Sequence, residues 1–230
     1  MTDRAFPSRP GGTAPHVLVE DIAAPVLSDD EHHHLGRVRR LRVGDAVSVT
    51  DGRGAWRWCA YGPALQVEGP IECDPPPAPR LVLAFALVKG QKPELVVQKL
   101  TELGIDEIVP FVAERSVVRW DEDSIARHTA RLRTVAREAA QQSRRTWFPD
   151  VSPIVSFAEV AARPGAVRCE MGGPPVTAEH TTVLVGPEGG WAESETALPS
   201  VGLGSTVLRA ETAAIAAATL MSDRRQVRPS

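Results

Sequence analysis

The sequence predicts an α/β protein in which a small β-rich domain precedes a larger domain built on a mostly parallel sheet. Three observations indicate this class. Short strand-like runs separated by turn signals occupy residues 16–72, a proline-rich segment follows at 74–79, and apolar strands then alternate with amphipathic helices. Dense prolines can neither donate to a sheet ladder nor continue a helix, so residues 75–79 predict a stiff linker. We therefore expect two domains, 1–74 and 80–230.

The first domain is predicted to hold short strands around one helix. Residues 28–31, Ser-Asp-Asp-Glu, form an acidic, capping-type start for a helix at 32–41. Turn signals at 43–45 and 51–54 separate the strand-like runs. We expect strands at 17–19, 46–50, 55–61 and 64–68, which favours a small barrel or sandwich.

In the second domain strands and helices alternate. The continuous apolar run 81–88 predicts a strand covered on both faces. A helix begins at Pro93 and ends at Gly104, and a second one runs from a cap at Ser124 to about 143. In the first of these helices the apolar positions Leu95, Val96, Leu100 and Leu103 fall on one side. Further strands are predicted at 107–111, 154–155, 167–170, 182–185 and 206–208, followed by an alanine-rich helix.

Composition limits the function classes. The chain has 230 residues and a net charge of −3, which does not indicate a nucleic-acid binder. Its apolar runs are too short to span a membrane, and residues 1–10 carry charge and proline without a signal-peptide core, so we expect a cytoplasmic protein with no membrane partner. Three cysteines without a Cys-x-x-Cys pair predict neither disulfides nor a zinc site. Adjacent histidines at 32–34 point apart on a helix, so we expect no metal there.

Positive charge is localised despite the negative total. Between residues 32 and 58 the sequence contains six arginines and two aspartates, Asp45 and Asp51, which gives a local net charge of +4. A second basic stretch runs over 127–145. A basic face of this kind favours phosphate contacts, and the alternative is a set of solvated surface side chains. Familiar catalytic loops are absent from the sequence: there is no GxxxxGK[ST], GxGxxG, HExxH or GxSxG motif.

Two glycine-punctuated turns lie near the C-terminus. Residues 186–190, Gly-Pro-Glu-Gly-Gly, follow the predicted strand 182–185, and Leu203-Gly204 precede the last helix. Ligands bind in open α/β sheets at the carboxyl ends of strands, and glycine lets the backbone approach a ligand closely. The turns therefore predict a pocket lined by main-chain groups, with a purely structural acidic turn as the alternative.

These turns belong to a longer composite pattern. The strings GPEGGWAESE at 186–195 and LGSTVLRAETA at 203–213 are accompanied upstream by ALVKG at 86–90, QKLTELG at 98–104, ERS at 114–116 and EAAQQS at 138–143. Near the N-terminus the pattern includes His33-His34-Leu35 and Gly44-Asp45. Over nearly its whole length the chain resembles the RsmE family of 16S rRNA uridine-N3 methyltransferases, in the SPOUT superfamily.

The resemblance implies a fold and an activity. It implies a PUA-like RNA-binding β-barrel over 1–74 and a SPOUT methyltransferase domain with a trefoil knot over 80–230. It also implies S-adenosylmethionine as cofactor, a homodimer, and N3 of a uridine, position 1498 of 16S rRNA in the 30S subunit, as the target. A methyltransferase for another rRNA or tRNA site, or a non-catalytic RNA-binding assembly factor, remain the alternatives.

The resemblance also implies site residues. Arg209, fixed between strand and helix, is the first catalytic candidate, followed by Arg115 and Arg145, because a guanidinium beside the uracil carbonyls would stabilise developing charge. A salt bridge to Glu211 is the structural alternative for Arg209. The expected cofactor-binding residues are Leu184, Val185, Gly186, Pro187, Glu188, Gly189, Gly190, Leu203, Gly204, Leu208, Arg209, Glu211, Thr212 and Ala213. The expected RNA-binding residues are His34, Arg37, Arg39, Arg40, Arg53, Lys89, Lys99, Arg115, Gln142, Ser143, Arg144 and Arg145.

One departure from the family pattern concerns the end of the long helix. The family's Gln-Ser-Gly-Arg stretch reads Gln142-Ser143-Arg144-Arg145 here, so an arginine stands where the family has glycine. We expect the positioning of the RNA, more than cofactor binding, to be affected.

Overall fold

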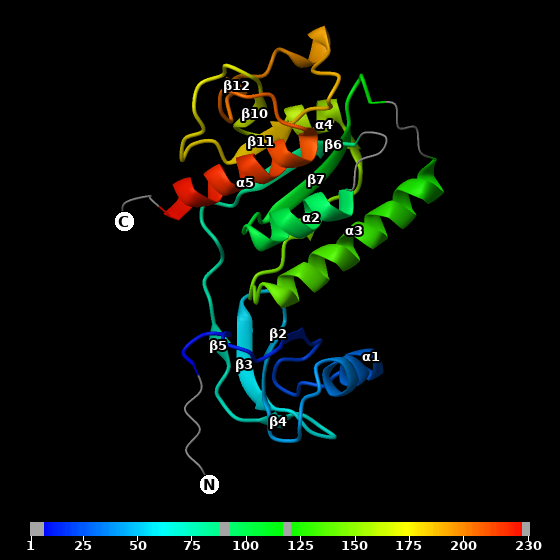
Figure 1. Cartoon of the computed structure of the whole chain (residues 1–230), viewed down its shortest axis with the longest axis vertical. Helices are drawn as coiled ribbons and strands as arrows, with labels where there is room; N and C mark the ends of the chain where they lie inside the picture. Colours follow the sequence, from blue (N-terminus) through cyan, green and yellow to red (C-terminus); the bar gives the residue numbers. More distant parts are fainter. Residues whose placement is uncertain (1–6, 88–92, 117–120, 227–230) are drawn as a thin grey trace. The chain divides into compact units, whose positions relative to one another are not determined.

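The structure is a computed structural model that describes residues 7–87, 93–116 and 121–226 (Figure 1). Its backbone divides into two compact units, here called unit 1 and unit 2. Unit 1 comprises Met1–Pro76 together with Ala140–Phe148, and unit 2 comprises Pro77–Ala139 and Pro149–Ser230. The division lies inside the proline-rich segment. The return of Ala140–Phe148 to unit 1 is a feature that the sequence did not predict.

Unit 1 is built on a five-stranded mixed sheet. Its strands are β1 (His16–Leu18), β2 (Ala46–Thr50), β3 (Ala55–Ala60), β4 (Gln66–Val67) and β5 (Glu72–Cys73). β1 lies parallel to β2, β2 and β3 are antiparallel, and both β4 and β5 pair with β3. Val17, Val47, Val49 and Cys59 form the centre of its core.

A short helix follows β1 in the chain. Helix α1 (Asp29–His33) continues into the π-helical turn η1 (His34–Val38). Ser28 caps it: the Ser28 hydroxyl accepts from the Glu31 amide and the Glu31 carboxyl accepts from the Ser28 amide, both at 3.2 Å. The predicted acidic capping start is confirmed, and it places the histidines and arginines that follow on an exposed helical turn.

Unit 2 holds a seven-stranded sheet in which every pair is parallel. Its strands are β6 (Val82–Ala86), β7 (Glu107–Val112), β8 (Asp150–Val151), β9 (Val155–Ser156), β10 (Ala166–Cys169), β11 (Thr182–Val185) and β12 (Ser200–Val201). The spatial order is β12-β10-β11-β6-β7-β8, with β9 also on β7. Residues 81–87 are all buried, as the continuous apolar run predicts.

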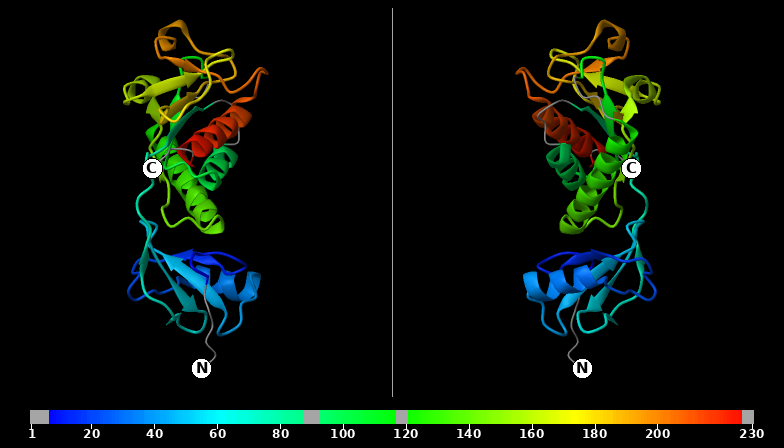
Figure 2. Two further views of the ribbon diagram at one scale, coloured as in Figure 1. Left: turned by 90° about the vertical axis from the view of Figure 1, so that its left-hand side faces the viewer. Right: turned by 90° about the vertical axis from the view of Figure 1, so that its right-hand side faces the viewer.

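Helices cover both faces of this sheet (Figure 2). α2 (Pro93–Glu102), α3 (Glu122–Gln142) and α5 (Ala210–Gln226) contribute Leu100, Leu132 and Ala217 to the larger core on one face. The short α4 (Phe157–Ala161) contributes Val160 to a smaller core on the other face. Within the described residues, no helix is both long enough and apolar enough to cross a bilayer.

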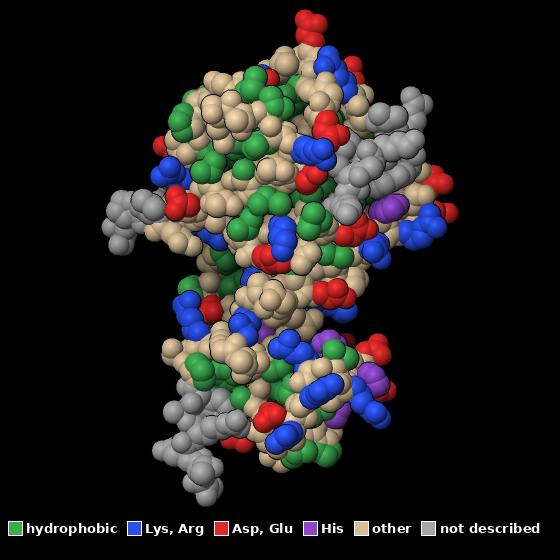
Figure 3. Space-filling view, in the orientation of Figure 1, with side chains coloured by type: hydrophobic (Ala, Val, Ile, Leu, Met, Phe, Trp, Pro, Cys, Tyr) green, Lys and Arg blue, Asp and Glu red, His purple; other side chains and the backbone are tan. Residues whose placement is uncertain are grey.

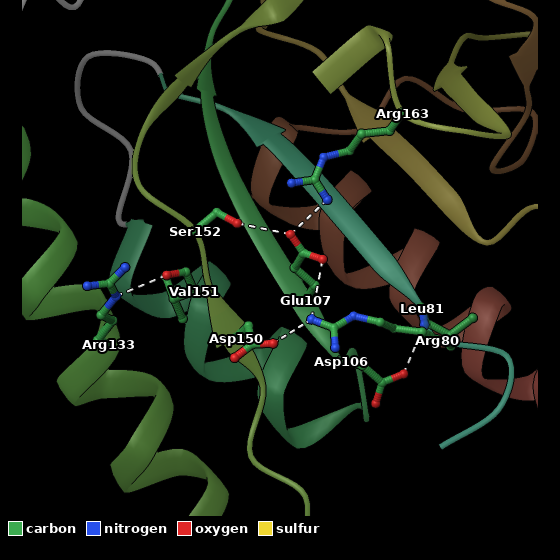
Figure 4. Close-up of polar contacts among 9 residues, drawn as sticks. All are labelled: Arg80, Leu81, Asp106, Glu107, Arg133, Asp150, Val151, Ser152 and Arg163. Carbon is green, nitrogen blue, oxygen red and sulfur yellow. Dashed lines mark hydrogen bonds and ion pairs between the residues drawn. The ribbon is translucent and has the colours of Figure 1, made fainter. Parts of the chain in front are cut away.

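Charged side chains close the amino-terminal edge of the sheet (Figure 4). Glu107 at the start of β7 accepts from Ser152 at 3.0 Å and pairs with Arg163 at 2.7 Å. Arg80 joins Glu107 to Asp150. Asp106 is buried and accepts from the Leu81 amide at 2.9 Å. This edge is fixed by ion pairs, so the open carboxyl edge is where a ligand site can form.

Two predictions about elements in unit 2 were wrong. Residues 206–208 form no strand, because no neighbouring strand pairs with them; the last strand is β12, before the Gly202-Leu203-Gly204 turn. Helix α3 begins at Glu122, and Asp121 is its cap, since the Asp121 carboxyl accepts from the Ser124 amide. Leu95, which lies on the apolar side of α2, is 36% exposed.

The chain after β12 lies against the loop that follows β10. The Gly202 amide donates to the Pro174 carbonyl at 2.7 Å, and Pro175 forms a parallel bridge with Gly202. A Cβ on Gly173 would lie 2.7 Å from the Val201 carbonyl carbon, so the two backbones approach too closely for a side chain there. Strand order does not define a knot, and the trefoil knot stays an implication of the family resemblance.

Candidate active site

A pocket of about 230 Å³ opens at the carboxyl edge of the unit 2 sheet. It lies where β10 and β11 end and where α5 begins. Three loops enclose it: the one after β10, the glycine turn after β11, and the segment between β12 and α5. The residues that line it are Cys169, Glu170, Met171, Val185, Gly186, Pro187, Glu188, Gly190, Trp191, Leu203, Gly204, Thr206, Val207, Leu208, Ala210 and Ala213.

Two of the lining glycines have a backbone that other residues rarely adopt. Gly190 has φ +73° and closes a tight turn, in which its amide donates to the Pro187 carbonyl at 2.9 Å. Gly204 has φ +142°, and a Cβ placed on it would meet nothing within 4 Å. The absence of side chains at these positions leaves main-chain groups and open space facing the pocket.

Trp191 fixes the glycine turn to the end of β10. Its indole nitrogen donates to the Cys169 carbonyl at 2.8 Å, and its ring stacks on Phe111 with a centroid separation of 6.3 Å. A Cβ on Gly186 would lie 2.7 Å from the Trp191 ring, so glycine is required there for the ring to pack. One aromatic side chain thus holds two of the three loops around the pocket.

The pocket combines apolar walls with carboxylates. Val185, Leu203, Leu208 and Ala213 supply apolar surface, and Glu188 is an exposed carboxylate on the lining, whereas the Glu170 carboxylate pairs with Arg168. Burial raises the pKa of the Cys169 thiol to about 12, so this side chain is neutral at physiological pH. Such a site favours a ligand that carries both an apolar part and positive charge.

Nine of the expected cofactor residues line this pocket. They are Val185, Gly186, Pro187, Glu188, Gly190, Leu203, Gly204, Leu208 and Ala213. Leu184 does not: alternation along β11 turns it into the smaller core, where it is fully buried. Gly189, Arg209, Glu211 and Thr212 also lie outside the lining.

Sequence reasoning missed seven lining residues. These are Cys169, Glu170, Met171, Trp191, Thr206, Val207 and Ala210. A signal existed for the first three, because the carboxyl end of a predicted strand next to β11 belongs to the same edge. Thr206 and Val207 were read as a strand, yet they lie in the irregular segment that faces the pocket.

The three catalytic candidates occupy different places. Arg209 is exposed next to the lining residues Leu208 and Ala210, and within the described part of the chain it forms no ion pair, so the salt bridge to Glu211 is absent. Arg115 is exposed, and its Nη1 donates to the Gly189 carbonyl at 3.0 Å. Arg145 belongs to unit 1, where its Nε donates to the Trp147 carbonyl at 2.9 Å.

Most of the expected RNA-binding residues gather in unit 1. His34, Arg37, Arg39, Arg40 and Arg53 are exposed there, and Figure 3 shows basic and histidine side chains together around α1 and the segment after it. The segment Ala140–Phe148 brings Gln142, Ser143, Arg144 and Arg145 to the same unit. Lys99 lies in unit 2 and pairs with Glu102 at 2.7 Å, and Lys89 lies outside the described residues.

Arg144, which stands where the family pattern has glycine, has a left-handed backbone. Its φ is +57°, and the Arg145 amide donates back to the Ala140 carbonyl at 2.9 Å, as at a helix end closed by a left-handed residue. Its guanidinium donates to the carbonyls of Gly12 and Ala14. Arg144 therefore fastens the N-terminal segment of unit 1 to the end of α3, and that guanidinium is engaged within the protein.

Among the described residues, no three His, Cys, Asp or Glu side chains are grouped so that they could hold a metal ion. His32, one of the three adjacent histidines, is used structurally: its Nε2 lies 3.0 Å from the Gly62 carbonyl and its ring lies against Tyr61.

Known protein families match both parts of this arrangement. Residues 75–222 match a family described as an RNA methyltransferase domain, and residues 27–60 match an RNA methyltransferase PUA domain. The ribosomal RNA small subunit methyltransferase E of Mycobacterium tuberculosis is 32% identical, over 87% of this chain and 86% of the relative. The chain belongs to the ribosomal RNA small subunit methyltransferase E family. The family's Bacillus subtilis member is 28% identical, over 89% of this chain and 91% of its own.

Solved structures agree with the fold. The Neisseria gonorrhoeae ribosomal RNA small subunit methyltransferase E, bound to S-adenosyl methionine, superposes with a TM-score of 0.75 and 24% identity over 91% of this chain and 97% of its own. A putative methyltransferase from Legionella pneumophila, in complex with the same cofactor, gives a TM-score of 0.79 and 23% identity over 91% and 97% of the two chains. At these identities the likeness establishes the fold, which is the one expected from the family resemblance.

Proposed function

We propose that this protein transfers a methyl group from S-adenosylmethionine to N3 of a uridine in 16S rRNA of the 30S subunit, with position 1498 as the expected target. The observation that carries the proposal is the pocket at the carboxyl edge of the parallel sheet. Its lining combines the two glycine turns with apolar walls and two carboxylates. Membership of the small-subunit methyltransferase E family supplies the substrate class.

The lining residues fit S-adenosylmethionine by their chemistry. Val185, Leu203, Leu208 and Ala213 would hold its apolar parts, and the open main chain at Gly190 and Gly204 would meet its polar groups. Glu188 places negative charge on a lining that would face a cation, and the Glu170 carboxylate is already paired with Arg168. S-adenosylmethionine supplies a methyl group on a cationic sulfur. The other expected cofactor residues that lie near these loops would act on the cofactor from outside the lining; they are Gly189, Arg209, Glu211 and Thr212.

In methyl transfer the uracil N3 would bond to the methyl carbon while the carbon–sulfur bond breaks, so that S-adenosylhomocysteine leaves and the N3 proton passes to water. Negative charge develops on the flanking carbonyl oxygens of the base, and a fixed guanidinium beside them stabilises it. Arg209, exposed next to the pocket, is the catalytic residue that we assign first. Arg115 is the second, because it already contacts the glycine turn. Arg145, in unit 1, is kept as a third.

Unit 1 would bind RNA. In this proposal residues 1–74 form the PUA-like domain, residues 80–230 form the methyltransferase domain, and exposed Arg37, Arg39 and Arg40 contact phosphates. The RNA would also contact His34, Arg53, Gln142 and Ser143. A base inside structured RNA must leave its stack to reach a methyl donor, and phosphate contacts can hold the RNA while it does so.

A homodimer is part of the proposal. Met171 is 65% exposed and Val207 is 82% exposed, and both lie on the pocket lining. Large apolar side chains exposed together at a site are typical of a surface that another protein covers. A second copy of the chain would cover them and close the pocket from outside.

The test is methyl transfer from labelled S-adenosylmethionine to unmodified 30S subunits, with the modified nucleoside mapped by mass spectrometry. A single N3-methyluridine at position 1498 is the expected result. Label in another rRNA position or in tRNA would replace the proposed target. Binding of S-adenosylmethionine without any incorporation would leave a methyltransferase whose RNA target is another one, and absence of cofactor binding would favour a non-catalytic assembly factor.

A further inference from the structure

A buried carboxyl group joins two loops at the carboxyl edge of the unit 2 sheet. Glu195, at the end of the short helix η2 (Glu193–Glu195), is 2% exposed. Its Oε1 accepts from the Glu114 amide at 2.9 Å, and its Oε2 accepts from the Ala192 amide at 2.9 Å. Glu114 belongs to the loop after β7, and Ala192 follows the glycine turn after β11. Residues 81 positions apart along the chain are thereby held together.

Two further contacts link the same loops. The Ser194 hydroxyl donates to the Glu114 carboxyl group, and Arg115 Nη1 donates to the Gly189 carbonyl at 3.0 Å. The loop after β7 is itself closed, because the Ser116 amide donates to the Ala113 carbonyl at 2.9 Å. Arg115 is consequently carried by a closed loop that is fastened to η2 through Glu114 and to the glycine turn through Arg115 itself.

We propose that Glu195 is a positioning residue that holds Arg115 against the glycine turn of the pocket. The proposal rests on the function proposed above, in which Arg115 meets the RNA. The guanidinium has five N–H donors, of which the Gly189 carbonyl uses one, and its exposed position leaves it accessible to a base or phosphate. Its distance from the pocket is set by the Glu114 backbone, and Glu195 fixes that backbone.

A carboxyl group suits this task better than any neutral side chain. Each of its two oxygens accepts one backbone N–H, so two donors on different loops are satisfied by one buried group. Glutamine has the same size but only one acceptor oxygen, and its amide NH₂ would face an N–H donor. Glu195→Gln therefore breaks one of the two links without opening a cavity.

The test compares Glu195→Gln with Glu193→Gln, which changes an exposed carboxylate in the same helix. We expect Glu195→Gln to lower kcat/KM for 30S subunits about 10- to 100-fold, while the Kd for S-adenosylmethionine changes less than about threefold. In an Arg115→Ala background, Glu195→Gln should cost less than about threefold, because its effect acts through Arg115. Additive losses in the double variant, or an equal loss of cofactor binding, would overturn the proposal.

A second readout needs no substrate. Amide hydrogen exchange at Glu114 in the unliganded protein should accelerate at least about tenfold in Glu195→Gln and remain unchanged in Glu193→Gln. Unchanged exchange at Glu114 would contradict the positioning role of Glu195 even if neither the wild type nor any variant methylates RNA. The positioning role and the proposed methyl transfer are therefore tested separately. If Glu195→Gln does not fold, Ser194→Ala removes the exposed link to the same loop. It should lower kcat/KM about two- to fivefold, and an unchanged value would count against the proposal.

Discussion

At the scale of single residues, the buried His16 decides a property that the sequence does not reveal. His16 in β1 is 4% exposed; its Nδ1 lies 2.8 Å from the Ser48 hydroxyl and its Nε2 lies 3.0 Å from the Arg145 carbonyl. Burial lowers the pKa of His16 from 6.5 to about 4, and the nearby Arg144 charge acts in the same direction against the backbone hydrogen bond. The imidazole is therefore neutral in the folded protein at physiological pH.

This pKa predicts an acid-sensitive unit 1. Between pH 6.5 and 4 the unfolded chain binds a proton at His16 that the folded chain does not, so the free energy of unfolding falls as pH falls. The full effect is about 3 kcal/mol. His16→Gln should remove this part of the pH dependence, as measured by urea unfolding at pH 7 and pH 4.5. An unchanged slope in the variant would show that other groups cause the acid sensitivity.

Arg209 supplies a second prediction at this scale. Because it lies outside the pocket lining, Arg209→Ala should lower kcat about 10²- to 10³-fold and change the Kd for S-adenosylmethionine less than about threefold. Single-turnover transfer and calorimetry measure the two quantities. Equal losses in both would assign Arg209 to cofactor binding, and the exposed Arg224 in α5 gives a control substitution.

At the scale of elements, the helix ends show what the sequence can and cannot predict. Helices α2 and α3 end in the same way: the Ile105 amide returns to the Leu100 carbonyl, and the Arg145 amide returns to the Ala140 carbonyl. The residue in the left-handed position is Gly104 in α2, which the sequence predicted, and Arg144 in α3, which it did not. An arginine carries no signal for that conformation, so the sequence did not predict it.

Arg144 gives the prediction for this scale. Its left-handed backbone costs about 1 kcal/mol relative to glycine, and its contacts to Gly12 and Ala14 offset part of that cost. Arg144→Ala keeps the strain and loses the contacts, so it should lower the free energy of unfolding. Arg144→Gly loses the same contacts without the strain and should be about 1 kcal/mol more stable than Arg144→Ala. Equal urea midpoints for the two variants would contradict this account.

The same distinction applies to the site. Local sequence predicted the longer strands, the parallel sheet and the glycine turns, because periodicity and turn chemistry act over a few residues, but it missed the two-residue strands β5, β8 and β12. It did not predict Trp191 against Cys169, or Glu195 against Glu114, since these pairs meet only when strands distant in the chain become neighbours. The strand predicted at 206–208 failed for the related reason that β structure requires a partner.

At the scale of the whole molecule, the arginine-rich segment 32–58 belongs to unit 1 and the pocket belongs to unit 2. The net charge is −3, yet six arginines occur between residues 32 and 58, and Arg37, Arg39 and Arg40 are exposed in unit 1. Binding of RNA should therefore weaken steeply with salt although the chain as a whole is acidic. The pocket belongs to unit 2, and the chain needs both units for the proposed reaction.

Salt dependence separates phosphate contacts from the rest. Arg37→Ala should weaken RNA binding and reduce the slope of log K against log salt by about 1. Arg57→Ala is not a suitable control, because Arg57 donates to the Gly69 carbonyl and supports unit 1 internally. Arg224→Ala removes an exposed charge in unit 2 and should leave the slope unchanged. Equal changes in slope for Arg37→Ala and Arg224→Ala would show that the phosphate contacts are not specific to unit 1.

The measurement that tests the central claim most directly is calorimetric titration of S-adenosylmethionine into the wild type and two glycine variants. Gly204 and Gly165 both have positive φ and open space where a side chain would stand, but only Gly204 lines the pocket. The account predicts that Gly204→Val weakens binding at least about tenfold, because its side chain occupies the pocket, while Gly165→Val stays within about threefold of the wild type. Equal affinity in the two variants would show that the cofactor does not bind between the glycine turns.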